Sequence, residues 1–366
     1  MAPHSPAGDS NPSLAESQMT DPICTVVGCF TTSLRKARGK GLSLFDGLPQ
    51  GEPALTLEGP PNPSYLVAAP HRGMVFSAHA DTDIVGTYAV DPATGVLRLS
   101  SEARTGGANG VSLALHPSGR FLYVANYASG SISTMPIGGA GVEDATQVLE
   151  LPGAPGPHRE QQSTSHPHHS VFDPSGQFLI VPDKGLDRIF VLLPDDGDGT
   201  LSAHSGVATR AGVGPRHIAF HAQRPRAYVV GELDGSVTVL DWNRDAGILT
   251  PLCAVPSLPP SYFGPNTAAE IVVSPSGRSL FVSHRGADVI AHLSLERPDE
   301  LPEIIEWLPS GGACPRFMTL TPDGRQLLVA NEESDNLALF TLGPDRERLV
   351  QLRQVASPSP AAIAFL

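Results

Sequence analysis

One unit of about 50 residues occurs several times in the sequence, and this repeat limits the fold more than any other feature. In the clearest copy, an apolar run at His168–Phe172 is followed by a turn at Asp173–Gly176 and a second run at Phe178–Pro182. A polar turn then leads to a third run, Arg188–Leu192. Short runs rich in β-branched and aromatic residues, separated by turns that contain Pro and Gly, are typical of antiparallel hairpins.

Related copies have the same order of runs and turns. They lie at Tyr65–Val90, Asn109–Ile137, Gly214–Leu240, Thr267–Leu295 and Cys314–Leu342. A weaker fourth run follows the third, as at Gln147–Leu151 and Ile304–Leu308. Four short strands in each unit predict a β-propeller, because a single blade cannot bury both of its faces alone.

The two ends of the sequence each contain part of one further unit. Pro360–Leu366 matches only a first strand, and three runs near the other end supply the remaining strands, at Thr25–Phe30, Gly41–Phe45 and Ala54–Leu57. The sequence therefore predicts an all-β fold, a seven-bladed β-propeller with four-stranded antiparallel blades and a ring closed by strands from both termini. Such closure leaves no free sheet edge. We expect one propeller domain at residues 22–366, after a disordered tail at residues 1–21 that is rich in Pro, Ser, Ala and Gly.

Charge and composition exclude several classes of function. With 37 acidic and 24 basic side chains the net charge is −13, which disfavours binding to a phosphate backbone, so no nucleic-acid partner is expected. No run approaches the ~20 apolar residues of a membrane span. The tail lacks the basic and apolar segments of a secretory signal, and the four cysteines show no paired spacing. We therefore expect a cytoplasmic protein with reduced thiols. No glycine-rich phosphate loop precedes a helix, so no cofactor is expected.

Equivalent positions in the repeat predict two rings of side chains around the central channel. The first ring lies six residues before the proline of the turn that follows the first strand, which is Pro174 in the clearest copy. It holds Val111, His168, Arg216, Ala269 and Arg316. The second ring, just after the second strand, holds Tyr127, Lys184, Glu232, Arg285 and Glu332. Four of these ten positions carry Lys or Arg, where 24 such residues in 366 would place roughly 0.7 by chance. A cluster of cations in a net-acidic protein indicates an anionic ligand.

Other interpretations of these residues are structural. Arg216 with Glu232, or Arg316 with Glu332, could be ion pairs that join one blade to the next. His166 and His168 lie on one face of a strand, as metal ligands can, but no third ligand stands at a suitable spacing, so no metal is expected. We interpret His217 as an ordinary turn or core histidine.

The motifs resemble those of the seven-bladed propeller lactonases, a family that includes bacterial 6-phosphogluconolactonases and the fungal carboxy-cis,cis-muconate cyclase. The resemblance extends from Ile23 to Leu366. Its most specific stretches are Asn62-Pro63-Ser64-Tyr65-Leu66, Val124-Ala125-Asn126-Tyr127, Ser165-His166-Pro167-His168, Gly214-Pro215-Arg216-His217, Glu232-Leu233, Ala269-Glu270-Ile271, Arg285-Gly286 and Val329-Ala330-Asn331. The resemblance implies a catalytic quartet of His168, Arg216, Glu232 and Arg285. We expect substrate contacts from Tyr127, Lys184, Glu270, Arg316 and Glu332.

The sequence departs from the family pattern beside this quartet. It has Gly231-Glu232-Leu233 where members often have Asn-Glu-Leu, and His284-Arg285-Gly286 where they have Asn-Arg-Gly. It also has Gly110-Val111-Ser112 where members tend to have Pro-x-His. The quartet is retained while the adjoining pocket wall differs.

The expected activity is hydrolysis of an anionic sugar lactone, most similar to 6-phosphoglucono-lactone, at the mouth of the channel. This is a carboxylic-ester hydrolysis within carbohydrate metabolism and the pentose phosphate pathway. Arg216 and Arg285 would stabilise the oxyanion, and either Glu232 or His168 would be the general base. The alternatives are a carboxymuconate-type cyclase and a non-enzymatic interaction scaffold. We expect a monomer or a weak homo-oligomer. An enzyme requires that the quartet surround one open pocket.

Overall fold

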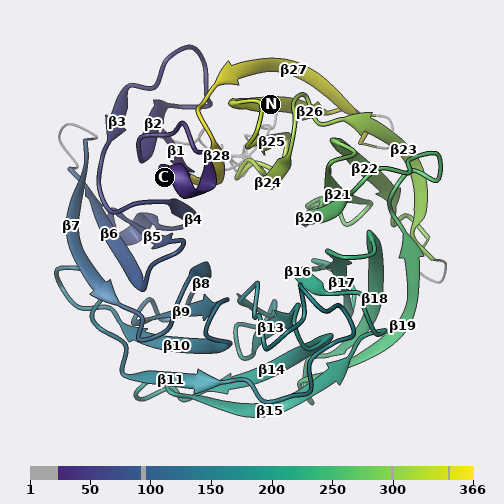
Figure 1. Ribbon diagram of the computed structural model, residues 1–366, viewed down its shortest axis with the longest axis horizontal. Helices are drawn as coiled ribbons and strands as arrows, with labels where there is room; N and C mark the ends of the chain where they lie inside the picture. The colour runs from purple at the N-terminus through teal and green to yellow at the C-terminus, as the bar shows by residue number, and fades with distance from the viewer. Residues whose placement is uncertain (1–23, 92–95, 298–300, 345–346) are drawn as a thin grey trace, which may run out of the picture.

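The computed structural model describes residues 24–91, 96–297, 301–344 and 347–366. Within these residues the strands form seven four-stranded antiparallel sheets, which stand as blades around a central channel (Figure 1). The all-β, seven-bladed prediction is confirmed. The tail at residues 1–21 lies outside the described residues. No helix in the described part of the chain is long and apolar enough to cross a membrane.

The blades follow one another along the chain, and each runs outward from its innermost strand. The closing blade holds β28 (Pro360–Phe365), β1 (Cys24–Cys29), β2 (Leu42–Asp46) and β3 (Leu55–Leu57). The second holds β4 (Pro63–Ala69), β5 (Met74–His79), β6 (Ile84–Val90) and β7 (Leu97–Arg104), and the third holds β8 (Gly110–Leu115), β9 (Phe121–Asn126), β10 (Ser131–Pro136) and β11 (Gln147–Glu150). The fourth holds β12 (Val171–Phe172), β13 (Leu179–Asp183), β14 (Arg188–Pro194) and β15 (Leu201–Ala208).

The remaining three blades repeat this arrangement. The fifth holds β16 (Pro215–Phe220), β17 (Arg226–Gly231), β18 (Ser236–Asn243) and β19 (Ile248–Pro256). The sixth holds β20 (Thr267–Val273), β21 (Ser279–Arg285), β22 (Val289–Ser294) and β23 (Glu303–Pro309), and the seventh holds β24 (Pro315–Leu320), β25 (Gln326–Asn331), β26 (Asn336–Leu342) and β27 (Leu349–Ala356). Two short 3-10 helices, η1 (Ser33–Arg35) and η2 (Pro70–Arg72), lie in loops.

The apolar core consists of the interfaces between neighbouring blades. In one such interface Tyr123 and Ile132 of the third blade pack with Leu179 and Phe190 of the fourth. The second strand of a blade is buried along all or nearly all of its length, as in β9 and β17, because a neighbouring blade covers each face. This explains why these strands are nearly continuous apolar runs and do not alternate with polar residues.

The ring closes where β28 pairs with β1, as the sequence predicts. Thr25 lies opposite Phe365 and Val27 opposite Ile363. The Cys24 N–H donates to the Leu366 carbonyl at 3.1 Å, and the Leu366 N–H returns a bond to Cys24 at 3.0 Å. The closing ladder therefore joins the two ends of the described chain.

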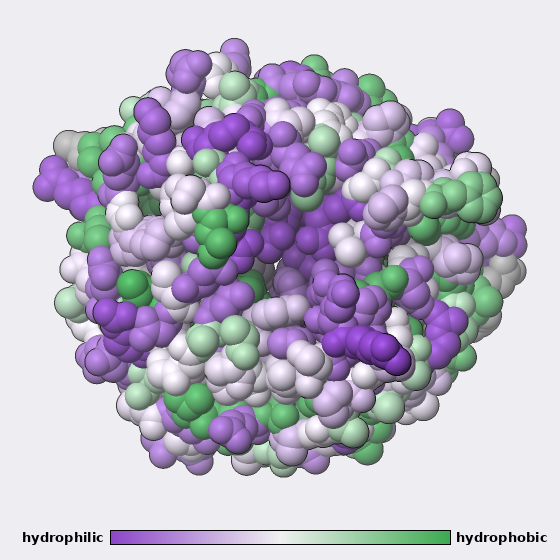
Figure 2. All heavy atoms as spheres, in the orientation of Figure 1, coloured by the Kyte–Doolittle hydropathy of each residue, from purple (hydrophilic) through white to green (hydrophobic). Residues whose placement is uncertain are grey.

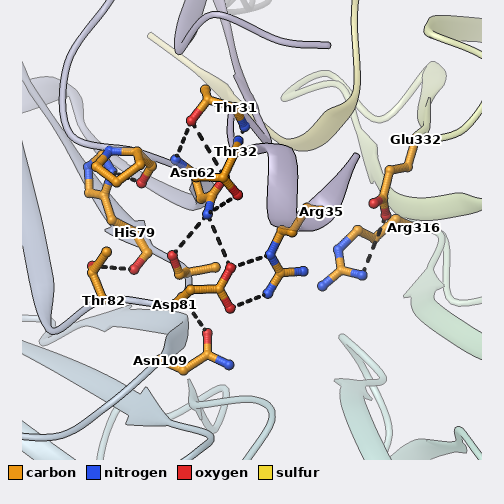
Figure 3. A network of polar contacts seen from close by, with 12 residues as sticks. Thr31, Thr32, Arg35, Asn62, His79, Asp81, Thr82, Asn109, Arg316 and Glu332 are labelled. Carbon is orange, nitrogen blue, oxygen red and sulfur yellow. Dashed lines mark hydrogen bonds and ion pairs between the residues drawn. The ribbon is translucent and has the colours of Figure 1, made fainter. Parts of the chain in front are cut away.

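The loop between β1 and β2 fixes the closing blade to both of its neighbours, and Figure 3 shows its contacts with the second blade. Arg35 forms two hydrogen bonds with Asp81 of the second blade, at 2.6 and 2.8 Å, and Arg38 pairs with Asp335 of the seventh. The Asn62 side-chain oxygen accepts the backbone N–H groups of Thr31 and Thr32, at 2.9 and 3.1 Å. The loop therefore supplements the β1–β28 ladder with polar bonds on either side.

A β-bulge occurs at the same place on the innermost strand of all seven blades. In the fifth blade Pro215 lies opposite Gly231 but Ile218 opposite Val229, so Arg216 and His217 occupy the bulge. The same one-residue shift occurs in β4, β8, β20, β24 and β28. In the fourth blade it falls between the isolated Pro167–Asp183 bridge and Val171, which pairs with Ile180. A bulge redirects side chains from strict alternation, and here it lies beside the channel.

Candidate active site

The predicted quartet comes together at one end of the channel. His168 lies in the bulge that precedes β12, and Arg216 lies in the bulge of β16. Glu232 directly follows β17, and Arg285 is the last residue of β21. Inner strands begin and second strands end at this side of the ring, so the topology gathers the four side chains. Figure 2 shows a hollow at the centre of the face, surrounded by hydrophilic residues.

Glu232 is the centre of this cluster. Its Oε1 accepts a hydrogen bond from Lys184 Nζ at 3.1 Å and lies 3.1 Å from Arg285 Nη2. Its Oε2 lies 3.4 Å from Arg216 Nε and 3.9 Å from His168 Nε2. Burial raises the pKa of Glu232, but Arg285, Lys184 and Arg216 outweigh that effect and lower it to about 2. Glu232 is therefore a carboxylate at neutral pH and a weak base.

Positive charge exceeds negative charge in this region. Lys184, Arg216 and Arg285 share Glu232, while Arg316 pairs with Glu332 at 3.5 Å (Figure 3). Burial and, to a smaller extent, the neighbouring Arg285 lower the pKa of Arg216 to about 9, against the opposing effect of Glu232. Burial also lowers the pKa of Arg316. Both shifts follow from holding cations away from water beside other cations.

Two of the cations also bind the backbone, which corrects one expectation from the sequence. The ring positions predict that Arg216 and Arg285 face the central channel, but their side chains are only 3% and 14% exposed. Arg216 donates to the Ala269 carbonyl of the next blade, and Arg285 donates to the carbonyls of Thr267 and Ala268. Replacing Arg216 will therefore affect stability as well as any binding of substrate.

The predicted substrate contacts fall into three groups. Tyr127 accepts a hydrogen bond from Lys184 Nζ at 3.3 Å, so both belong to the Glu232 cluster. Arg316 lines the channel and pairs with Glu332. Glu270 does not line the cavity described below; it lies behind His217, whose Nδ1 is 2.7 Å from Glu270 Oε1. A direct contact between Glu270 and substrate is therefore not supported.

A small cavity lies on the axis of the ring beside the Glu232 cluster. Six blades contribute to its wall, almost entirely through residues at or next to the bulges: Ser64, Tyr65, Val111, His168, Arg216, His217, Arg316, Phe317 and Ala361. The predicted first ring is thus correct for Val111, His168, Arg216 and Arg316. Ala269 does not line the cavity; its carbonyl accepts from the Arg216 guanidinium.

Sequence reasoning missed several residues of this site. His217 lines the cavity, and its ring stacks on that of His169 with 4.3 Å between centroids and 8° between planes. Gln161, from the long loop before β12, accepts a hydrogen bond from Lys184 Nζ at 2.7 Å. His217 could have been found as the residue that follows a ring position, had the bulge been anticipated. Gln161 lies outside the repeat and gave no signal.

Among the described residues, no three His, Cys, Asp or Glu side chains converge as metal ligands would. His166 is occupied otherwise: its Nδ1 lies 2.8 Å from the Tyr127 carbonyl, and its ring stacks on that of Tyr127. The chemistry available at this site is therefore that of cations, a carboxylate and histidines.

The fold and site together define a closed seven-bladed propeller with a cationic cluster at one end of its channel. A comparison with protein-family profiles makes the assignment specific. The profile described as "Lactonase, 7-bladed beta-propeller" matches residues 25–365, and the chain belongs to this family.

Relatives with assigned names agree with the family. The 6-phosphogluconolactonase of Bacillus subtilis (strain 168) is 29% identical over 308 residues, which cover 83% of this chain and 87% of the relative. That of Formosa agariphila is 29% identical over 343 residues, covering 90% and 95%. The solved structure of the Pseudomonas aeruginosa periplasmic gluconolactonase PpgL superposes with a TM-score of 0.84 at 29% identity, covering 94% of this chain and 98% of that one. These similarities support a lactonase.

Proposed function

We propose that the protein hydrolyses an anionic sugar lactone, 6-phosphoglucono-lactone or a close relative, beside the Glu232 cluster. One observation carries the proposal: four cations, Lys184, Arg216, Arg285 and Arg316, outnumber the three carboxylates near them, Glu232, Glu332 and Glu270, beside a cavity that Arg216 and Arg316 line. A buried charge without a partner is costly, so an excess of buried cations favours an anionic ligand. The names of the relatives from Bacillus subtilis and Formosa agariphila support a phosphorylated sugar lactone.

The cations have two tasks in this proposal. Arg216 lines the cavity and would stabilise the oxyanion that forms when water attacks the lactone carbonyl. Arg285, Lys184 and Arg316 would bind the phosphate or carboxylate of the substrate, and Arg285 would share the oxyanion with Arg216. Glu232 would hold three of these cations in position.

The proton acceptor is a separate question. Ester hydrolysis needs a base that can take a proton from water near neutral pH. Glu232 is unsuitable because its pKa is about 2. Burial and the nearby Arg216 hold the pKa of His168 well below 6.5, so His168 is neutral and able to accept a proton. Of the two bases left open by the sequence, His168 is therefore the better candidate.

A non-enzymatic scaffold is the second candidate. The pairs expected of a scaffold are present, Arg216 with Glu232 at 3.4 Å and Arg316 with Glu332 at 3.5 Å. The four cations still outnumber the three nearby carboxylates, Glu232, Glu332 and Glu270, however, which a purely structural network would avoid. We include in the proposal a role in the pentose phosphate pathway, a cytoplasmic location and a monomeric or weakly associating state.

The test compares kcat/KM of the purified protein for 6-phosphoglucono-δ-lactone, a carboxylate-bearing muconolactone and unphosphorylated glucono-δ-lactone, each at low and high salt. We expect an anionic lactone to be preferred by at least about tenfold and to lose affinity as salt rises, because salt screens the attraction between the approaching substrate and the cations. Equal values for charged and uncharged lactones, with no dependence on salt, would contradict the proposal. A preference for the muconolactone would favour cyclase-type chemistry.

A further inference from the structure

A second polar pair, His217 and Glu270, lies next to the Glu232 cluster, and His217 lines the cavity. His217 Nδ1 lies 2.7 Å from Glu270 Oε1, and both side chains are buried, at 3% and 7% exposed. They belong to neighbouring blades, on the inner strands β16 and β20. Each occupies the bulge of its strand, and the two bulges turn the histidine and the carboxylate toward each other.

The free nitrogen of His217 is available to a ligand. No described residue gives His217 Nε2 a hydrogen-bond partner, although the ring is buried and lines the cavity. Since Nδ1 faces a carboxylate, it carries the proton, and Nε2 presents a lone pair. An unpaired buried acceptor of this kind is costly unless water or substrate occupies the adjoining space.

The neighbouring histidines are less well suited to accept a proton. His169 uses both ring nitrogens: Nδ1 accepts the Ile218 N–H at 3.3 Å, and Nε2 lies 3.2 Å from the Tyr65 hydroxyl. His168 lines the cavity, but its nearest carboxylate oxygen, on Glu232, is 3.9 Å away. Only His217 among the three has a carboxylate at hydrogen-bond distance to fix its tautomer, and the stacked ring of His169 holds its plane.

We propose that His217 is the catalytic base that activates the hydrolytic water, with Glu270 as the residue that positions it; this rests on the lactonase function proposed above. A histidine oriented by a carboxylate, with its second nitrogen toward the reacting atoms, is the arrangement that general-base catalysis uses on unrelated folds. The assignment differs from both bases considered from the sequence, Glu232 and His168.

The reaction then proceeds in two steps. His217 Nε2 takes a proton from water as the water oxygen bonds to the lactone carbonyl carbon, and the resulting oxyanion lies toward Arg216. The tetrahedral intermediate collapses with cleavage of the bond between that carbon and the ring oxygen. The imidazolium returns its proton to the departing alkoxide. The product is the open-chain hydroxy acid, which releases one proton to solvent as a carboxylate.

The charges around the pair make it sensitive to substrate. Burial and the cations Arg216, Arg316 and Arg285 hold the pKa of His217 well below 6.5, with Glu232 acting in the opposite sense. A bound anion would offset those cations, so His217 becomes a stronger base when substrate is present. Burial raises the pKa of Glu270 to about 7, against the opposing effects of Arg216 and His169. Glu270 should therefore lose its proton and become a carboxylate as pH increases through about 7, and activity should rise over the same range.

The experiment measures kcat, KM, the pH–rate profile and the thermal midpoint for the wild type and four variants with 6-phosphoglucono-δ-lactone, after subtraction of the spontaneous rate. H217Q removes the base, E270Q removes the carboxylate and E270D retains it. H292Q is the matched control: His292 is fully buried in β22, 3.7 Å from the Glu306 carboxylate and 2.9 Å from the Ser279 hydroxyl, away from the cavity lining.

We expect H217Q to lower kcat by about 10²- to 10⁴-fold with KM changed less than about threefold. E270Q should lower kcat and abolish the rise in rate through about pH 7, whereas E270D should be slower but keep that rise. H292Q should retain the wild-type kcat even if it melts earlier. Should H217Q not fold, the pH–rate profile of E270Q decides.

Two failures can be told apart. If the wild type is active but H217Q keeps more than about a tenth of its kcat, or E270Q keeps the wild-type pH–rate profile, the role of this pair is overturned and the lactonase proposal stands. If the wild type hydrolyses none of the charged or uncharged lactones, the lactonase proposal is overturned, and the role of the pair with it.

Discussion

Replacing Glu232 with Gln is the most direct test of the charge distribution in the channel. The substitution keeps the shape of the side chain but removes the carboxylate that Lys184, Arg216 and Arg285 share at 3.1–3.4 Å. Removing one partner of a buried ion pair typically costs 3–5 kcal/mol, because the remaining charge stays buried without compensation. Three cations lose their partner here, so we expect E232Q to lose about 3–5 kcal/mol of unfolding free energy.

The assay is denaturant unfolding of E232Q and the wild type, with and without 6-phosphogluconate or inorganic phosphate. An anion should restore part of the lost stability in E232Q and stabilise it more than it does the wild type, because it replaces the missing negative charge. D241N is the matched control. It removes the carboxylate that pairs with Arg226, and because that pair is partly exposed the loss should be below about 1 kcal/mol.

Two outcomes would refute this reasoning. If E232Q unfolds at the wild-type denaturant concentration, the three cations do not depend on Glu232. If anions stabilise E232Q no more than D241N, the excess positive charge is not accessible to a ligand.

Further predictions concern pH and ring closure. His168, His169 and His217 have folded pKa values well below 6.5, so the unfolded chain binds more protons below that pH and stability should decrease on acidification. Glu270 has the opposite effect. Because its pKa is raised to about 7 in the folded protein, its contribution to folding stability is lost as pH rises from 4.5 through 7. With three histidines against one carboxyl group, the melting temperature should fall between pH 7 and pH 5; a constant or rising value would contradict the burial of neutral histidines. Deleting Pro360–Leu366 removes the partner of β1 and exposes its edge, so size-exclusion chromatography should show aggregation; a monodisperse truncated protein would mean that closure does not depend on β28.

The fold could be predicted because the copies of the repeat can be aligned with one another, which shows which residues are equivalent in each blade. Aligning the copies on the turn after the first strand assigns the first three strands of each unit, and the unmatched first strand at Pro360–Leu366 identifies its partners near Thr25. Each blade buries both faces against its neighbours, so the apolar runs that mark the strands are long and repeated. Local pattern and tertiary packing therefore lead to the same answer.

The site could be predicted only in part, and the bulges are the reason. Ring positions identify Arg216 and Arg316 correctly, because equivalent residues of a repeat occupy equivalent places. The sequence favours an ordinary turn or core histidine at His217, and strict alternation would also turn the residue after each ring position away from the channel. The one-residue register shift at Arg216 and His217 allows both to line the cavity. No local composition marks that shift, since it depends on hydrogen bonds to a strand more than ten residues away.

Because the bulge recurs in every blade, each blade contributes its own side chain to the region around the channel. Interblade packing requires side chains to alternate between the two faces of a strand, but the residue in each bulge does not follow this alternation. The seven bulge residues are Ser64, Val111, His168, Arg216, Ala269, Arg316 and Ala361. An exchange at one of them changes the channel wall while the apolar interfaces on either side of the blade are left as they were. The ligand specificity of the channel can therefore change by substitution in one blade at a time. Val111 and Ala361, which line the cavity with small apolar side chains, are the positions where a new polar group could be introduced for a different ligand.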